Sequence, residues 1–210
     1  MGVRSPKHEY ARPGAAESPS ALRCTRKAAP VLACAILCWL FWGAPKALSQ
    51  SDDDAEYKVK LAFLYNFAQF VQWPPEAFHD ANATFSVCVA GENPFKGELE
   101  QALRGRTAGG HPIEIKRLMP GDNPRACHLI FVRAGQRKAS ESMLNGLRGS
   151  SILTVGESKG FAERGGVINL TLEENKLGLE INTDAAGQSH LKISSKLLAL
   201  AKIVKEPRNP

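Results

Sequence analysis

The sequence pattern with the clearest chemical meaning is the pentapeptide Gly156-Glu157-Ser158-Lys159-Gly160. It has the G-x-S-x-G form of a hydrolase nucleophile elbow, and an acid and a base, Asp184 and His190, follow it in the required order. However, these two residues are only six positions apart, whereas the acid and base of a catalytic triad converge from separate loops. The nearest candidate for an oxyanion loop, Gly109-Gly110-His111, is typical of a turn before a strand. We therefore interpret the pentapeptide as a turn and predict no catalytic residue.

Sequence signals for a bound nucleotide or metal are also missing. Neither the G-x-G-x-x-G nor the G-x-x-x-x-G-K-[ST] pattern of phosphate-binding loops occurs. Glu173-Glu174 is interpreted as a solvated turn and not as an acid/base pair. The histidines beyond residue 49 lack the spacings that are typical of zinc ligands; they are His79, His111, His128 and His190. We predict no cofactor and no metal site.

The first 49 residues have the order of a secretory signal: a basic stretch up to Lys27, an apolar run over 28–44, and small residues at 47–49. A membrane anchor is an alternative, but the apolar run is shorter than the roughly 20 residues that a spanning helix needs. Lipidation at Cys34 is a weaker alternative, because most of the apolar run follows that residue. We expect a signal peptide over 1–49, cleaved near Ser49, and a single exported domain over 50–210.

The expected signal peptide also accounts for the basic charge of the chain. Of the net +6, the first 49 residues hold seven Lys/Arg against two Asp/Glu, a surplus of five. The remaining 20 bases and 19 acids then give only +1. We therefore predict no nucleic-acid partner.

Two of the five cysteines, Cys88 and Cys127, lie beyond the expected signal peptide. An even pair in an exported chain favours a disulfide. Two buried thiols are the alternative. A redox enzyme is not predicted, because the chain has no Cys-x-x-Cys spacing.

The elements that must position these residues begin with a predicted helix from Ser51 to about Gln72. Ser51 and three aspartates supply a cap and negative charge at its start, and Trp73-Pro74-Pro75 ends it. Its apolar residues form two adjacent stripes that together cover roughly half the circumference. The stripes are Tyr57, Leu61, Leu64, Ala68 and Val71, and Phe63, Phe67 and Phe70.

This apolar face is wider than packing against one sheet usually needs. One explanation is that loops of the same chain cover it. The other is a dimer or partner surface, because aromatic residues dominate the energetics of interfaces. For that surface we predict Phe67, Phe70 and Trp73 as anchors, with Tyr65 near them.

After this helix, strand and helix periods alternate. Strands are predicted at 85–90, 113–118, 128–132, 151–155, 167–172 and 177–182, and helices at 94–104, 138–147 and, as a short turn, 159–163. The last two strands flank a polar turn and predict an antiparallel hairpin. A final helix is predicted from the spacing of Ile193, Leu197, Leu200, Ala201 and Val204. Together these patterns predict an α/β fold, a three-layer sandwich with a mostly parallel sheet and flanking N- and C-terminal helices.

An ordered set of segments resembles the YfiR family, also catalogued as DUF4154. The resemblance covers about Ala55 to Val204, and none of its motifs names a reaction. The segments that carry it are residues 55–60, 64–68, 70–74, 85–89, 127–132, 152–156, 165–169, 179–182 and 191–201.

The resemblance implies a periplasmic protein with a Rossmann-like fold. It implies repression of an inner-membrane diguanylate cyclase of the YfiN type through its periplasmic sensor region, which lowers cyclic di-GMP. It also implies a homodimer, and an outer-membrane lipoprotein of the YfiB type that can sequester the repressor. Cys88 and Cys127 match one family disulfide, whereas a second cysteine pair of some members is absent, so redox control is not carried over.

A different class of function is a periplasmic small-molecule-binding module that acts on another membrane receptor, such as a sensor kinase. Its ligand would occupy the crevice at the carboxyl ends of the strands, near Gly91-Glu92-Asn93 and Arg133-Ala134-Gly135-Gln136. Lys192 is a possible contact for an anionic effector, with a solvated lysine as the alternative.

Overall fold

The computed structural model describes residues 49–80, 82–173 and 176–207. The expected signal peptide lies outside these ranges except for its last residue. Among the helices in the described ranges, none combines the length and the apolar character needed to cross a membrane.

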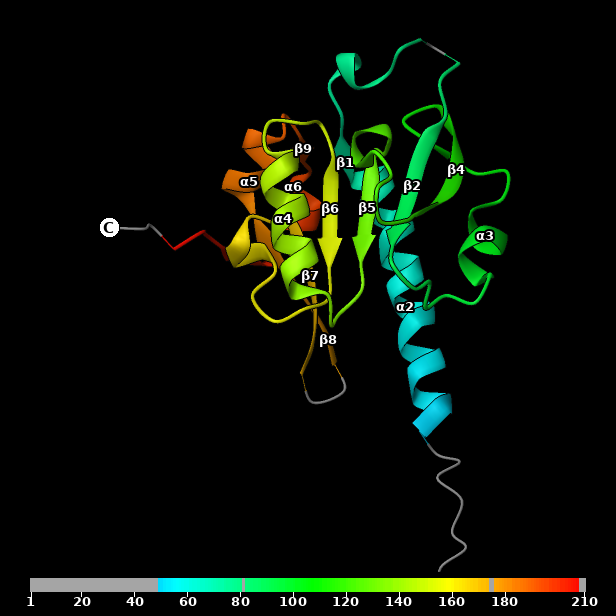
Figure 1. Ribbon diagram of the computed structural model, residues 1–210, viewed down its shortest axis with the longest axis vertical. Coiled ribbons are helices and arrows are strands. Elements are labelled where there is room, and N and C mark those ends of the chain that lie inside the picture. Colours follow the sequence, from blue (N-terminus) through cyan, green and yellow to red (C-terminus); the bar gives the residue numbers. More distant parts are fainter. Residues whose placement is uncertain (1–48, 81, 174–175, 208–210) are drawn as a thin grey trace, which may run out of the picture. The chain divides into compact units, whose positions relative to one another are not determined.

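Eight strands form the central sheet, in the order β10-β8-β7-β6-β5-β2-β4-β3 (Figure 1). The five strands from β4 through β2, β5 and β6 to β7 run parallel, whereas β8 is antiparallel to β7 and β3 is antiparallel to β4. The β7–β8 pair confirms the predicted hairpin. The strands are β2 Phe85–Ala90, β3 Thr107–Ala108, β4 His111–Leu118, β5 Leu129–Val132, β6 Leu153–Gly156, β7 Ile168–Glu173, β8 Lys176–Asn182 and β10 Lys202–Val204.

Helices cover both faces of this sheet, because its central strands bury side chains on both sides. Every residue of β2, β5 and β6 is buried. Val87 and Val89 belong to an apolar cluster with α2, α3, α5 and α6, whereas Cys88 and Ile130 belong to a second cluster with α4. Alternate residues of a strand point to opposite faces, so the two clusters are the two sides of a three-layer fold, as predicted. The helices are α2 Ser49–Phe70, α3 Glu98–Leu103, α4 Arg137–Leu147, α5 Thr183–Gln188 and α6 Ser195–Leu198, with 3-10 turns η1 Pro75–Ala77, η2 Pro124–Ala126 and η3 Ala162–Arg164.

Helix α2 buries part of the apolar face that its spacing predicts, whereas Phe70 of the second stripe is 37 % exposed. Leu64 and Ala68, from the first stripe, are in the core. The helix ends at Phe70, two residues before the predicted end, because Val71–Gln72 forms strand β1 and pairs antiparallel with β9, Lys192–Ile193. This short two-stranded sheet ties the end of α2 to the C-terminal part of the chain.

The predicted C-terminal helix is wrong in its length. The segment forms strand β9, the four-residue helix α6 and strand β10, which pairs in parallel with β8. Leu200, assigned to the buried face of that helix, is 74 % exposed. A spacing of three and four residues fits a helix and also this alternation of short elements, and tertiary pairing decides between them. Helix α5 was not predicted.

Helix α3 also begins later than predicted. It starts at Glu98, because Gly97 has a φ of 85°, a left-handed conformation that interrupts a helix and that glycine adopts readily. Phe95, two positions before Gly97, is instead a core residue that packs on Phe131, with ring centres 5.1 Å apart.

A disulfide joins Cys88 in the middle of β2 to Cys127 just before β5, which confirms the predicted pair. The two Cα atoms are 5.9 Å apart and the residues are 39 positions apart in sequence. Both side chains are buried, at 1 % and 4 % exposed, within the cluster that α4 covers. The bridge therefore links two neighbouring strands inside the core.

Replacing both cysteines by alanine is expected to lower the free energy of unfolding by about 4 kcal/mol, because the bridge restricts a loop of about 40 residues in the unfolded chain. Guanidinium titrations of the wild type and of Cys88→Ala/Cys127→Ala would measure the difference. A reductant should destabilise the wild type and leave the variant unchanged. A wild type that is no more stable than the variant would contradict this account.

Candidate functional site

The carboxyl ends of the parallel strands are the expected place for a ligand crevice. The chain passes from β2 to β4 on one side and then returns to β5 on the other side of β2. In open α/β sheets, ligands bind at such a switch in strand order. The loops that meet there are those after β2 and β5, which include Glu92 and Arg133, and next to them the turn after β6 with Glu157.

A buried ion pair fills part of this edge. The ammonium of Lys60, on α2, lies 2.5 Å from Oε2 of Glu157 and also contacts Glu56. The Lys60 and Glu157 side chains are only 4 % and 3 % exposed. The other oxygen of Glu157 accepts hydrogen bonds from the Tyr57 hydroxyl at 3.1 Å and from the backbone N–H of Ala134 at 3.0 Å. Both carboxylate oxygens therefore have donors from α2 or from the loop after β5.

The electrostatics of this cluster are those of a charged pair held out of water. Burial acts to lower the pKa of Lys60, but its hydrogen bonds to Glu157 and Glu56 outweigh this effect and the pKa is raised. Burial and the negative charge of Glu157 raise the pKa of Tyr57, which therefore stays protonated and donates. The arrangement keeps Lys60 charged and binds α2 to the sheet.

In the rest of the predicted crevice, side chains of the two loops contact each other. Arg133 pairs with Glu92 at 2.6 Å, which joins the loops after β5 and β2. The Gln136 side chain lies so close to Gly91 that a Cβ on that glycine would be 2.1 Å from Nε2. Below them the Tyr57 ring packs edge-on against Phe95, with ring centres 5.6 Å apart. The two loops that were predicted to hold a ligand thus contact each other.

The G-x-S-x-G pentapeptide forms a turn, in which Phe161 N–H donates to the Ser158 carbonyl at 2.9 Å. Within the described residues no hydrogen bond joins Ser158 to Asp184 or His190, and both of these residues are exposed. Glu157, the residue of this pattern that the sequence analysis did not single out, is the one with a defined role. Its partner on α2 is 97 residues away in sequence, so no local signal pointed to it.

Of the four predicted surface aromatics, one is a core residue and a second is partly buried against the core. Phe67 is 0 % exposed, so it cannot be an anchor on a surface; it faces the sheet because it lies within three and four residues of Leu64 and Val71. Trp73 packs edge-on against Phe85, with ring centres 4.7 Å apart, and its indole N–H donates to the His128 carbonyl at 3.2 Å. Much of the wide apolar face of the helix is thus covered by the chain itself.

The other two aromatics remain accessible. Phe70 is 37 % exposed at the end of α2. Tyr65 is partly buried, and the guanidinium of Arg106 lies 4.5 Å from the centre of its ring. Lys192 is exposed in β9, opposite Gln72, and the N–H of Ser194 next to that strand donates to the Phe70 carbonyl at 2.9 Å. Phe70 and Lys192 therefore belong to neighbouring parts of the surface.

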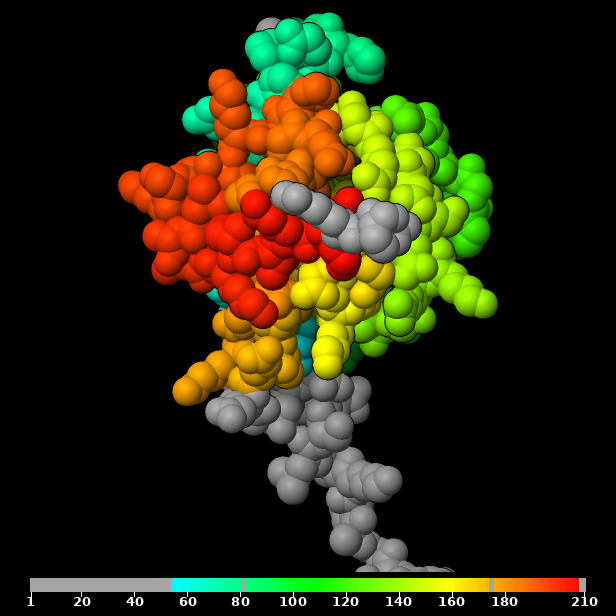
Figure 2. All heavy atoms as spheres, turned by 90° about the vertical axis from the view of Figure 1, so that its left-hand side faces the viewer, coloured from blue at the N-terminus to red at the C-terminus, as the bar shows by residue number. Residues whose placement is uncertain are grey.

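A second group of exposed apolar residues lies in the C-terminal segments, which face the viewer in orange and red in Figure 2. Leu200 and Ile203 are 74 % and 46 % exposed. The sequence analysis missed them as surface residues because it placed Leu200 inside a helix packed on the core. Ile203 lies in β10, the edge strand of the sheet.

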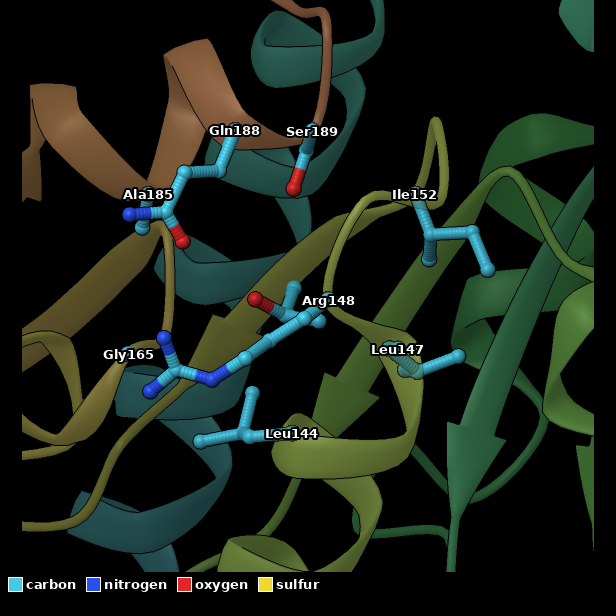
Figure 3. Close-up of a pocket in the computed structure, with 9 residues that line it drawn as sticks. Leu144, Leu147, Arg148, Ile152, Gly165, Ala185, Gln188 and Ser189 are labelled. Atoms are coloured by element: carbon cyan, nitrogen blue, oxygen red, sulfur yellow. The ribbon is translucent and has the colours of Figure 1, made fainter.

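Hollows of the described part of the chain also lie away from the carboxyl edge, and two of them bear on the argument. A cavity of about 20 Å³ separates the end of α4 from α5, with Leu144 and Arg148 on one side and Gln188 and Ser189 on the other (Figure 3). It has room for about one water molecule. The second, of about 550 Å³, lies at the amino ends of the strands and is lined by η1, the residues after it, and His128. Within the described residues, no three His, Cys, Asp or Glu side chains gather into a metal site.

Replacing Glu157 by glutamine is expected to lower the free energy of unfolding by about 3 kcal/mol, because it leaves the Lys60 charge in a closed site with Glu56 as its one remaining anionic partner. Urea unfolding would measure this loss.

The double variant Lys60→Met/Glu157→Gln should recover most of that loss, since it removes both charges. The control Glu98→Gln breaks the exposed Lys58–Glu98 pair and should change stability by less than about 1 kcal/mol. Equal effects of Glu157→Gln and Glu98→Gln would contradict the buried-pair account.

Comparison with protein families gives one assignment. Residues 57–202 match the family model DUF4154, described as YfiR/HmsC-like. No curated protein matches the chain. The matched range includes Tyr57 and Lys60 at one end and the start of β10 at the other, so it contains nearly every element described above. The chain belongs to the YfiR/HmsC-like family.

Proposed function

We propose that this protein is a non-enzymatic periplasmic regulator of cyclic di-GMP signalling, which represses an inner-membrane diguanylate cyclase by binding its periplasmic sensor region. The observation that carries the proposal is the family match over residues 57–202, because this family is regulatory and not catalytic. The expected export of residues 50–210 is consistent with it. In this scheme an outer-membrane lipoprotein of the YfiB type sequesters the repressor and releases the cyclase.

Repression of this kind needs a surface and no reacting group. A ligand shifts a two-state partner only by the difference between its affinities for the two states. A change from 1 % to 99 % of the inactive state needs about 5.5 kcal/mol of differential binding. A few well-packed aromatic or aliphatic anchors supply that much in ordinary protein interfaces.

The proposed contact surface, for the cyclase or for a second copy in a homodimer, is the end of α2 together with β9. Phe70 supplies an exposed aromatic ring there, Tyr65 a partly buried one, and Lys192 a positive charge. Strand pairing between β1 and β9 holds these residues on one rigid unit, which limits the entropy lost on binding. Phe67 is buried in the core and the partly buried Trp73 packs on Phe85 and donates to His128, so neither is proposed as an anchor any longer.

The rival function, a small-molecule sensor with its ligand at the carboxyl edge, is less well supported by the geometry. Its two loops are joined by the Arg133–Glu92 pair and by Gln136 packed on Gly91. A ligand would have to break these contacts and displace side chains that already fill the switch point. We therefore propose a protein partner as the regulated target.

Deleting the gene is expected to raise cellular cyclic di-GMP, because the cyclase loses its repressor. A copy exported through its own signal should restore the low level, and a copy that lacks residues 1–49 should not. Mass spectrometry of nucleotide extracts would measure the change. Unchanged cyclic di-GMP after deletion would reject the cyclase as the partner.

Phe70→Ser is expected to weaken association with the partner, or with a second copy, about tenfold or more, while the free energy of unfolding changes by less than about 1 kcal/mol. Analytical ultracentrifugation and affinity capture of the cyclase sensor region would measure association. Val59→Ser is the matched control, since Val59 is also exposed on α2, at 48 %, but lies three turns away. Equal losses for the two variants would reject this surface. Phe67→Ser should instead destabilise the fold by several kcal/mol.

A further inference from the structure

The segment from Trp73 to Asp80, called the strap from now on, lies across the amino end of the sheet. It contains η1 and projects at the top of Figures 1 and 2, at the end where β5 and β6 begin. His128, the residue before β5, is its main attachment. The Trp73 indole N–H donates to the His128 carbonyl at 3.2 Å, and the Phe78 ring stacks on the His128 ring with centres 4.6 Å apart and planes at 14°.

The hydrogen bonds of the His128 ring require its neutral form. The backbone N–H of Ser86 donates to Nδ1 at 3.0 Å, so Nδ1 carries no proton. Nε2 lies 3.1 Å from the carbonyl oxygen of Ala77, which can only accept, so Nε2 carries the proton and donates to the strap. A second proton would have to go on Nδ1, where it would face the Ser86 N–H. Protonated His128 therefore cannot keep its present position.

His111 on β4 makes a useful contrast. Its ring also stacks on Phe78, with centres 3.8 Å apart and planes at 5°. Its Nδ1 lies 2.8 Å from the Ala83 carbonyl oxygen, so Nδ1 donates and Nε2 takes any second proton. Protonating His111 therefore leaves its hydrogen bond intact. Of the two histidines that stack on Phe78, only His128 would lose a hydrogen bond when its ring takes a second proton.

The surroundings of His128 also favour its neutral form. Burial lowers its pKa, and the positive charges of His111, Lys116 and His79 lower it further, against the opposing effect of the Ala77 hydrogen bond. Lys116 is itself paired with Glu114 at 3.0 Å. The other charged groups that line the cavity next to the ring are Glu76 and Asp80 on the strap and Arg125 on η2.

The cavity of about 550 Å³ between the strap and the sheet gives protons and water access to this ring. Its lining includes Phe78 and His79 from the strap, Lys116 from β4, and Cys127 of the disulfide. A strap that leaves His128 would therefore enlarge an existing opening. Ser86 and the other strand residues below it would stay in place, because the sheet holds them.

We propose that His128 is an acid-sensitive latch, whose protonation releases the strap from the amino end of the sheet while the rest of the fold remains closed. The direction of the pH dependence follows from proton linkage. The released state binds the proton more readily than the latched state, so the contact is fully present above the ordinary pKa of histidine, about 6.5, and weakens as the pH falls below it. This inference goes beyond the proposed function and does not depend on it.

Hydrogen exchange of the folded protein tests the latch. The strap amides of Ala77 and Phe78, which donate to Pro74 and Pro75 carbonyls, are the reporters. Between pH 6.5 and 5.5 their protection factors, corrected for intrinsic exchange, should fall about fivefold, as a single linked proton with an ordinary pKa of about 6.5 in the released state predicts. The amides of Ile130 in β5 and Leu144 in α4 should keep theirs. Unchanged strap protection, or an equal fall at all four amides, would overturn the proposal.

Two variants separate His128 from its neighbours. In His128→Asn the amide oxygen replaces Nδ1 as the acceptor for Ser86 N–H but does not titrate, so strap protection should no longer depend on pH. His111→Asn is the control and should keep the pH step. A step that persists in His128→Asn rejects the latch. If that variant does not fold, an NMR titration of the wild-type His128 ring decides, since its midpoint must coincide with the loss of strap protection.

Discussion

The ion pair between Lys60 and Glu157 is the constraint on which the arrangement of this fold depends. Both side chains are excluded from water, and a buried charge without its partner costs several kcal/mol. Helix α2 can therefore pack on the sheet in only one register, the one that brings Lys60 to the turn after β6. From that register it follows that Leu64 and Phe67 face the sheet, and that the helix ends at the opposite edge, where Trp73 meets His128. One helix thus connects the two ends of the parallel strands.

This arrangement leaves the two ends of the strands with different properties. At the carboxyl end, ion pairs and packed side chains occupy the switch point where many α/β proteins bind ligands. At the amino end, the strap spans a cavity and is held by one neutral histidine and by aromatic stacking. Segments with few buried apolar contacts open at lower free-energy cost than core strands do. A conformational change is therefore less costly at the amino end than at the carboxyl end.

The sequence predicted the layers of this fold and the central strands, because there the local pattern and tertiary packing agree. Residues 85–90 form a continuous apolar run, and a run that is buried on both faces needs no alternation. The C-terminal helix was wrong because the spacing from Ile193 to Val204 suits a helix as well as two short strands, and pairing with β1 and β8 decides between them. The Lys60–Glu157 pair and the strap contacts of His128 join residues about 50 to 100 positions apart. No period within one segment encodes such contacts, so they could not be foreseen.

The accessible end of α2 and the strap are covalently adjacent, and this has a thermodynamic consequence. Two residues separate Phe70 from Trp73, and both of them, Val71 and Gln72, pair with β9. If a partner bound at Phe70 prefers the latched strap, linkage requires that the partner also lower the proton affinity of His128, by the same factor by which protonation weakens binding. Because the coupling is reciprocal, it can be measured from either side. A partner that binds equally well at pH 7.5 and 5.5 would show that binding at the end of α2 and protonation of His128 are not coupled.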